Sequence, residues 1–188
     1  MTKHQETDRE RLLALLRKLS FERRPVTLAS GKQSDFYLDC RQTSLTAEGH
    51  FLIGRLLLQQ IHQSGLPVEA AGGLTLGADP LASAVSLTSY LDGAPLAAFL
   101  VRKEAKAHGL GQQVEGLKSI RPGASVALLE DVVTTGGSAL RAAEAVRAAG
   151  LVPVLVCAIV DRGDGGAEAI AVAGLPLRSL FSRADFLS

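Results

Sequence analysis

Residues 126–140, with the sequence VALLEDVVTTGGSAL, bring together side chains that could bind a phosphate group. The paired glycines would let the backbone come close to a bulky anion, and the flanking hydroxyl groups could donate hydrogen bonds to its oxygens. A helix that begins at this point would add unpaired backbone amides and a dipole of favourable sign. The residues concerned are Thr134, Thr135, Gly136, Gly137 and Ser138. This stretch predicts a cradle for a phosphomonoester.

Two adjacent acids, Glu130 and Asp131, precede the predicted cradle. Carboxylates beside a phosphate would repel it unless they bind another part of the same ligand. Because carboxylates accept hydrogen bonds, they suit the vicinal hydroxyls of a ribose or the waters held by a metal ion. A phosphate next to a diol describes a ribose 5-phosphate, although a plain strand, turn and capped helix with surface acids remains the alternative. Neither a GxxxxGK[ST] motif nor a helix-opening GxGxxG motif occurs in the sequence.

The cradle needs a strand before it and a helix after it, and the sequence predicts both. Ser125–Leu129 is a short apolar strand, and Ser138–Ala149 is a helix that Gly150 would close. Other predicted strands alternate with helices, and repeated β-then-α order favours a mostly parallel sheet with helices on its faces. These strands are Val68–Gly72, Leu96–Val101 and Leu151–Val160. In such a sheet, ligands bind beyond the carboxyl ends of the strands.

Before these strands, the sequence predicts two helices separated by a small hairpin. The first helix should end near Ser20, two short β-like pieces follow within residues 25–41, and the next helix should stop at Gly65. Several residues have the type and position expected of a helix N-cap. They are Thr7 with its capping-box partner Glu10, Thr46, and Asp79 with Pro80 after it.

Length and composition restrict the kind of protein. A chain of 188 residues predicts one domain, since domains commonly have about 100–200 residues. The 20 Lys and Arg against 19 Asp and Glu leave a net charge of only +1, which argues against nucleic acid as a partner. The longest apolar run, Leu151–Val160, is too short to span a membrane. Cys40 and Cys157 form no CxxC pair, so a reducing cytoplasm is expected.

Several segments carry a family resemblance. EDVVTTGGS resembles the motif with which type I phosphoribosyltransferases bind 5-phosphoribosyl diphosphate (PRPP), and further segments resemble the orotate-specific members of that family. These segments are SGKQSDFYLD at 30–39, VRKEAKAHG at 101–109 and the VDR of Val160–Arg162. The resemblance implies an α/β fold whose central, mostly parallel sheet is flanked by helices. It also implies a single domain over 1–188, with a small N-terminal hood at 20–45 and a flexible catalytic loop at 102–119.

The resemblance also implies roles for individual residues. In this family the loop closes over the diphosphate, and its cations stabilise the charge that develops on that leaving group. The catalytic residues would be Lys103, Lys106, His108 and Asp131. PRPP would contact Arg102, Lys103, Lys106, His108, Glu130, Asp131, Val132, Val133, Thr134, Thr135, Gly136, Gly137 and Ser138. Orotate would contact Tyr37, Leu38, Thr134 and Arg162, of which Arg162 would pair with its carboxylate.

The implied reaction is the transfer of the phosphoribosyl group from PRPP to orotate, which serves pyrimidine nucleotide synthesis. Mg²⁺ would be held mainly by PRPP, with waters between the ion and Glu130 or Asp131 and no direct protein ligand. The implied assembly is a cytoplasmic homodimer in which loop cations reach the neighbouring site, with neither nucleic acid nor membrane as a partner.

The sequence departs from some relatives at two places. Leu76 and Gly77 stand where certain members have an aromatic residue and a lysine, and Ala29 stands where some have a lysine. Fewer cations would then surround the diphosphate. Two alternatives remain at this point. A purine-type phosphoribosyltransferase should lack the loop and the hood, and a non-catalytic PRPP-binding regulator would lose the loop cations and add a DNA-binding segment.

Overall fold

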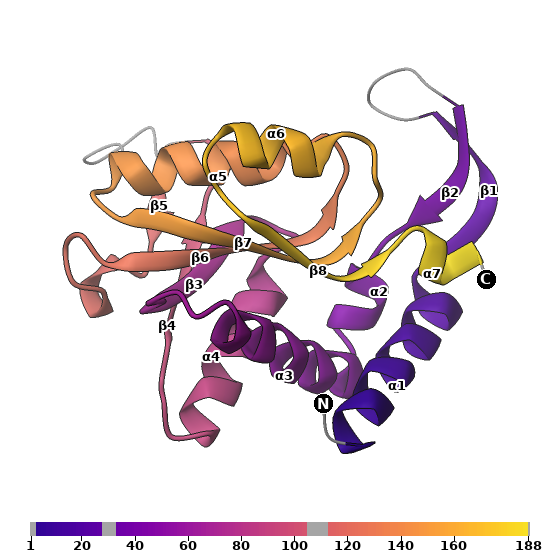
Figure 1. The fold of residues 1–188 in the computed structure, drawn as a ribbon, viewed down its shortest axis with the longest axis horizontal. Coiled ribbons are helices and arrows are strands. Elements are labelled where there is room, and N and C mark those ends of the chain that lie inside the picture. The colour runs from indigo at the N-terminus through magenta and orange to yellow at the C-terminus, as the bar shows by residue number, and fades with distance from the viewer. Residues whose placement is uncertain (1–2, 28–32, 105–112, 188) are drawn as a thin grey trace.

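A six-stranded sheet lies at the centre of the molecule, with helices on both of its faces (Figure 1). The computed structural model describes residues 3–27, 33–104 and 113–187. Within these ranges the strand order is β5-β4-β3-β6-β7-β8. The strands are β3 (Ala70–Leu74), β4 (Ala97–Val101), β5 (Val114–Glu115), β6 (Ser125–Val133), β7 (Val152–Asp161) and β8 (Leu177–Ser182). All neighbours pair in parallel except β4 and β5, so the predicted mostly parallel sheet is confirmed.

The helices divide between the two faces of the sheet. Figure 1 shows α3 and α4 below the sheet, with α1 beside them, and α5 and α6 above it. Their bounds are α1 (Lys3–Leu19), α3 (Ala47–Gln63), α4 (Asp79–Leu91), α5 (Gly137–Ala148) and α6 (Gly166–Val172). Each layer has its own apolar core: Leu57 and Leu81 belong to the lower one, and Val146 and Ile170 to the upper one. Because both faces are covered, β7 is a nearly continuous apolar run.

Strand β6 is longer than the sequence predicts. Its expected end at Leu129 is wrong, because Val132 and Val133 continue to pair with Val160 and Asp161 of β7. Glu130 and Asp131 therefore belong to the strand, and only the residues after Val133 form the turn into α5. This extension places one of the two acids inside the protein, where its chemistry differs from that of a surface acid.

The helix boundaries test the predicted caps. The hydroxyl of Thr46 accepts a hydrogen bond from the Gly49 amide at 3.0 Å, so this N-cap is confirmed. The capping roles predicted for Thr7 and Asp79 are wrong. Helix α1 already begins at Lys3, and the N-cap of α4 is Ala78, whose amide bonds back to the carbonyl of Leu74 at 3.2 Å.

The predicted hairpin is present and stands at one end of the molecule (Figure 1). Its strands β1 (Phe21–Thr27) and β2 (Gln33–Leu38) are antiparallel and lead into the short helix α2 (Arg41–Ser44). The rings of Phe21 and Phe36 lie 4.9 Å apart within the hairpin, and the buried Phe36 belongs to the lower apolar core of the body. The C-terminal helix α7 (Ala184–Leu187) packs beneath it through Phe186, whose ring centroid is 5.6 Å from that of Phe36.

No helix in the described ranges is long and apolar enough to cross a membrane.

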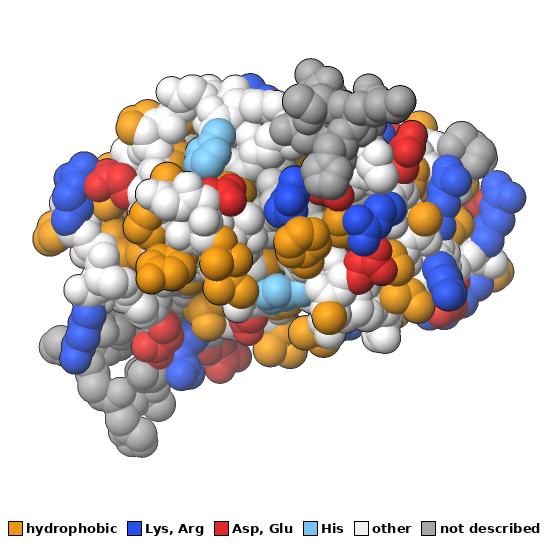
Figure 2. Space-filling model, turned by 90° about the horizontal axis from the view of Figure 1, so that it is seen from below, with side chains coloured by type: hydrophobic (Ala, Val, Ile, Leu, Met, Phe, Trp, Pro, Cys, Tyr) orange, Lys and Arg blue, Asp and Glu red, His pale blue; other side chains and the backbone are white. Residues whose placement is uncertain are grey.

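Figure 2 views the face that carries α3 and α4 and shows apolar side chains gathered near its middle. On these helices Phe51, Leu87, Tyr90 and Leu91 are at least half exposed. Such a concentration of exposed apolar side chains is typical of a surface that another molecule covers.

Candidate active site

A cavity of about 390 Å³ opens at the carboxyl ends of β3 and β6. It is lined by Glu130–Val132 of β6, by Leu74 at the end of β3 and by the turn 75–77 that follows. Ser138 and Arg141 of α5 line one wall. This is the edge of a parallel sheet at which ligands bind, so the cavity lies where the topology predicts chemistry.

The hairpin and the strand β4 supply the remaining walls. Tyr37 and Leu38 of β2 line the cavity, together with Asp39 and Arg41, which follow that strand. Lys103 lines it from the segment after β4. These elements are far apart in the sequence, so only the fold brings their side chains together. The cavity therefore unites polar groups from the hood, the cradle and the start of the loop.

Close backbone packing fixes the turn between β6 and α5. Gly136, the N-cap of α5, has a φ of 80°, a backbone conformation that residues with a side chain rarely adopt. A Cβ on Gly136 would lie 3.1 Å from the carbonyl oxygen of Gly166, and one on Gly166 would lie 2.5 Å from that of Thr134. The turn thus touches the start of α6 backbone to backbone. A Cβ on Gly137 would meet only the Thr135 hydroxyl at 3.8 Å, which leaves open space beside the first amides of α5.

The two acids differ in their surroundings. Glu130 is 7% exposed, and burial, with a further contribution from the neighbouring Asp131, raises the pKa of its carboxyl group to about 9. Near neutral pH Glu130 is therefore protonated and can donate as well as accept a hydrogen bond. Asp131 is half-buried, and its Oδ1 accepts from the Val132 amide at 2.9 Å. The cavity holds less negative charge than two ionised acids would give it.

Gly77 lies directly against Asp131. A Cβ at position 77 would be 2.7 Å from Oδ1 and 2.8 Å from the carboxyl carbon of Asp131. A larger residue, such as the lysine of some relatives, would require this carboxylate to shift. The departure noted at Gly77 is therefore coupled to the position of Asp131.

Arg162 lies beside the cradle, outside the set of residues that line the cavity. Its amide donates to the carbonyl of Val133 at 3.0 Å, which places it next to the end of β6. The side chain is buried, its guanidinium carbon is 5.3 Å from the ring centroid of Phe36, and its Nε is 3.2 Å from a carboxylate oxygen of Asp164. Arg162, which directly follows β7, therefore lies against the hood strand β2.

The structure unites many of the predicted site residues. In the cavity lining are Tyr37, Leu38, Lys103, Glu130, Asp131, Val132 and Ser138. Next to that lining in the chain, or beside it through the bond to Val133, lie Arg102, Val133, Thr134, Thr135, Gly136, Gly137 and Arg162. Arg102 forms an ion pair of 2.9 Å with Glu115. Lys106 and His108 lie outside the described residues, so their roles stay predictions.

Some cavity residues were not predicted from the sequence. Asp39 and Arg41 form an ion pair of 2.7 Å at the exit of the hairpin, and this guanidinium lowers the pKa of the Asp39 carboxyl group. Arg141 is exposed and lies three positions after Ser138 on α5. That spacing puts both on one helix face and could have indicated Arg141. No comparable spacing signal links Asp39 or Arg41 to the cradle.

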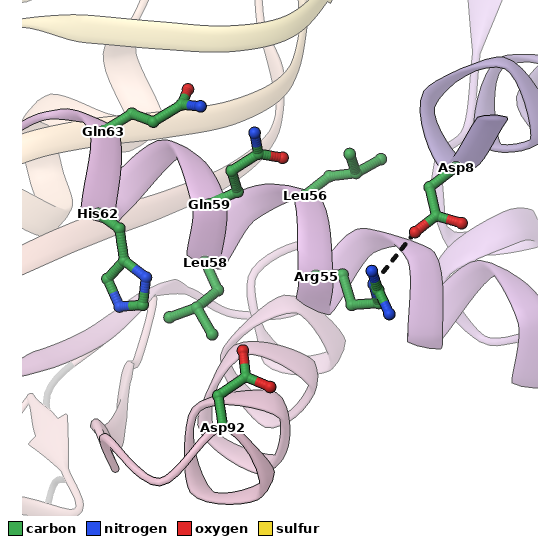
Figure 3. Close-up of a pocket in the computed structure, with 8 residues that line it drawn as sticks. All are labelled: Asp8, Arg55, Leu56, Leu58, Gln59, His62, Gln63 and Asp92. Carbon is green, nitrogen blue, oxygen red and sulfur yellow. Dashed lines mark ion pairs between the residues drawn. The ribbon is translucent and has the colours of Figure 1, made fainter. Parts of the chain in front are cut away.

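A second cavity, of about 430 Å³, lies between α1, α3 and the end of α4 (Figure 3). Its main charged pair is Asp8 and Arg55, whose carboxylate and guanidinium are 3.1 Å apart. The helices α3 and α4 end here, at Gln63 and Leu91, and the described lining of this cavity includes no strand residue. Its described lining contains neither glycine nor a hydroxyl side chain. The cavity at the carboxyl ends of β3 and β6 is the candidate active site because of its place in the sheet.

Within the described ranges, no group of three or more His, Cys, Asp or Glu side chains is arranged to hold a metal ion. Glu130 and Asp131 are the adjacent acids that line the candidate site. Two carboxyl groups suit contacts to hydroxyls or to metal-bound waters better than a complete set of metal ligands.

Comparisons with known proteins place this geometry in context. No family model matches the chain. An orotate phosphoribosyltransferase from Sorangium cellulosum is 56% identical over 182 residues, which cover 96% of this chain and 94% of that protein. The crystal structure of Mycobacterium tuberculosis orotate phosphoribosyltransferase in complex with Fe(III) dicitrate superposes with a TM-score of 0.81 at 44% identity, covering 95% of this chain and 98% of that one. The same enzyme's complex with PRPP gives 0.78 at 40% identity, with 96% and 99% covered.

The raised pKa of Glu130 predicts a pH-dependent stability. Between about pH 4.5, where the unfolded carboxyl group titrates, and about pH 9, only the folded protein keeps the proton. The free energy of unfolding should therefore fall as pH rises through this window, by up to about 1.4 kcal/mol per pH unit. Glu130→Gln should remove this decline. Urea unfolding of both proteins at intervals from pH 5 to 9 measures it, and parallel profiles would contradict the assigned pKa.

Proposed function

Because the chain belongs to the orotate phosphoribosyltransferase family, we infer that it transfers the 5-phosphoribosyl group from PRPP to orotate and releases diphosphate. The product, orotidine 5'-phosphate, is a pyrimidine nucleotide. The observation that carries this conclusion is 56% identity along almost the whole chain to an enzyme of that name. The cavity lined by Tyr37, Glu130, Asp131 and Ser138 supports this function. The identity favours this function over the purine-type alternative.

We propose that the cradle binds the ribose 5-phosphate part of PRPP. The 5'-phosphate would lie over Gly137, where the first amides of α5 point and a side chain would intrude. The ribose hydroxyls would meet Glu130 and Asp131 at the end of β6. A protonated Glu130 can donate to one hydroxyl oxygen while Asp131 accepts from another. The ribose is then fixed at both ends before its bond to diphosphate breaks.

Orotate is proposed to bind under the hood, against Tyr37 and Leu38, with Thr134 beside it. The Tyr37 and Leu38 side chains are half-buried and line the cavity, which supports a contact with a flat ring. Arg162 would hold the orotate carboxylate, since a guanidinium can donate two parallel hydrogen bonds to such a group. Its buried position beside Val133 puts its backbone next to Thr134, the residue proposed to touch both substrates.

The leaving diphosphate would be stabilised by cations. Lys103 lines the cavity, and Lys106 and His108 would approach with the rest of the loop. Charge develops on the diphosphate as the ribosyl bond breaks, so a cation brought to it lowers the barrier. Arg141 lines the cavity and supplies a positive charge, whereas Gly77 carries none.

We propose that Mg²⁺ binds here as an ion held mainly by PRPP. The cavity offers Glu130 and Asp131 as partners for its waters, and Mg²⁺ prefers to keep several of these. When bound with PRPP, the ion would neutralise part of the diphosphate charge. Glu130 and Asp131 would position the ribose, and Arg162 would position orotate.

The assembly we propose is a homodimer located in the cytoplasm. The exposed apolar side chains of α3 and α4, Phe51, Leu87, Tyr90 and Leu91, give a second copy a surface to cover (Figure 2). Cys40 and Cys157 are buried free thiols, as suits a reducing compartment. The formal net charge of +1 favours neither nucleic acid nor an anionic membrane as a partner.

The function is tested by substrate choice. The protein is mixed with PRPP, Mg²⁺ and one of orotate, uracil, adenine or hypoxanthine, and diphosphate release is followed. Release with orotate alone is expected. Release with adenine or hypoxanthine would support the purine-type alternative, and no release with any base would support a PRPP-binding regulator.

The loop assignment predicts that Lys106→Ala lowers kcat by about 10²–10³-fold, because one cation on the departing diphosphate is lost. The melting temperature is measured alongside, and an unchanged value separates a loss of catalysis from a loss of folding. Lys18→Ala, which removes an exposed lysine from α1, is the matched control. Turnover of Lys106→Ala within a few-fold of the control would rule out the proposed role.

A further inference from the structure

The ring of Phe36 lies close to two guanidinium groups. The guanidinium carbon of Arg162 is 5.3 Å from the ring centroid, and that of Arg183 is 5.5 Å from it. Phe36 is fully buried in the hood strand β2. Both distances are within the range of cation–π attraction, which strengthens when the groups are shielded from water. One aromatic ring thus connects Arg162 to an arginine of the C-terminal segment.

Arg183 is fixed by contacts to two other elements. Its amide donates to the carbonyl of Asp161 at 3.1 Å, one residue before Arg162. Its Nη2 donates to Oδ1 of Asp35, the residue before Phe36, at 3.1 Å. The same residue therefore touches the strand end that carries Arg162 and the hood strand that faces it. Both side chains of this ion pair are exposed, so it contributes little stability by itself.

The C-terminal segment that carries Arg183 is itself well anchored. The Asp185 carboxylate accepts from the Ser182 amide at 2.8 Å and pairs with Arg9 of α1 at 3.1 Å. The Phe186 ring packs edge-on against Phe36 with centroids 5.6 Å apart. The backbone on both sides of Arg183 is thus held to the body of the protein.

We propose that Arg183 is a positioning residue for orotate. This inference rests on the proposed function, in which Arg162 holds the orotate carboxylate. A bidentate pair needs a guanidinium held in place, and that of Arg162 lies between the Phe36 ring, at 5.3 Å from its carbon, and the Asp164 carboxylate, at 3.2 Å from its Nε. Arg183 holds that ring and the hood strand in register with Arg162 through the bond to Asp35. The base site therefore extends to the C-terminal segment.

The test compares kcat and the KM values for orotate and PRPP. Arg183→Gln should raise KM for orotate about threefold to tenfold and leave KM for PRPP within about twofold, because PRPP binds at the cradle. Arg183→Lys keeps the charge and should recover most of the loss. Asp35→Asn, which removes the partner in the hood, should shift the same constant in the same direction. Arg178→Gln, on the neighbouring strand β8, is the matched control and should change neither constant.

Arg162→Gln separates the inference from the function on which it rests. An increase in KM for orotate with Arg162→Gln, but none with Arg183→Gln or Asp35→Asn, overturns the inference and leaves the proposed function intact. Equal increases in both KM values for Arg183→Gln, with no recovery in Arg183→Lys, also overturn it, because they indicate a general structural role. An unchanged orotate KM in Arg162→Gln overturns the orotate contact of Arg162 itself.

Discussion

The approach of two backbones at the carboxyl edge of the sheet is the constraint on which the site depends. Gly166 at the start of α6 touches the carbonyl of Thr134, and Gly136 in turn faces Gly166. This contact sets the angle at which the chain leaves β6 and begins α5. The helix amides then point into the space over Gly137, and the acids at the end of β6 lie one short turn away. A side chain at position 136 or 166 would displace this turn, and the phosphate site at α5 would then move away from the ribose site at the end of β6.

Electrostatics then distinguish groups that look alike in the sequence. Glu130 and Asp131 are adjacent, yet burial makes Glu130 a neutral acid near pH 7 while Asp131 faces the cavity. That difference lets two acids lie beside a phosphate without doubling the repulsion. The absence of a side chain at Gly77 leaves room for the Asp131 carboxylate. The positive charge in the cavity lining then comes from other positions, among them Lys103 and Arg141.

The sequence could predict the features that are local. The strand, turn and helix around Gly136 and the cap at Thr46 depend on residues within a few positions of each other, and both are present. The extension of β6 to Val133 depends on pairing with β7, which no local pattern reveals. The part played by Arg183 depends on contacts with β2 and β7, and the short elements β8, α6 and α7 around it have too few residues for a clear period.

The most direct test of the account is a crystal structure of the protein with PRPP and Mg²⁺. The account predicts the 5'-phosphate at the first amides of α5, with the ribose hydroxyls within hydrogen-bond distance of Glu130 and Asp131. PRPP bound at another place, with the space over Gly137 empty, would contradict it.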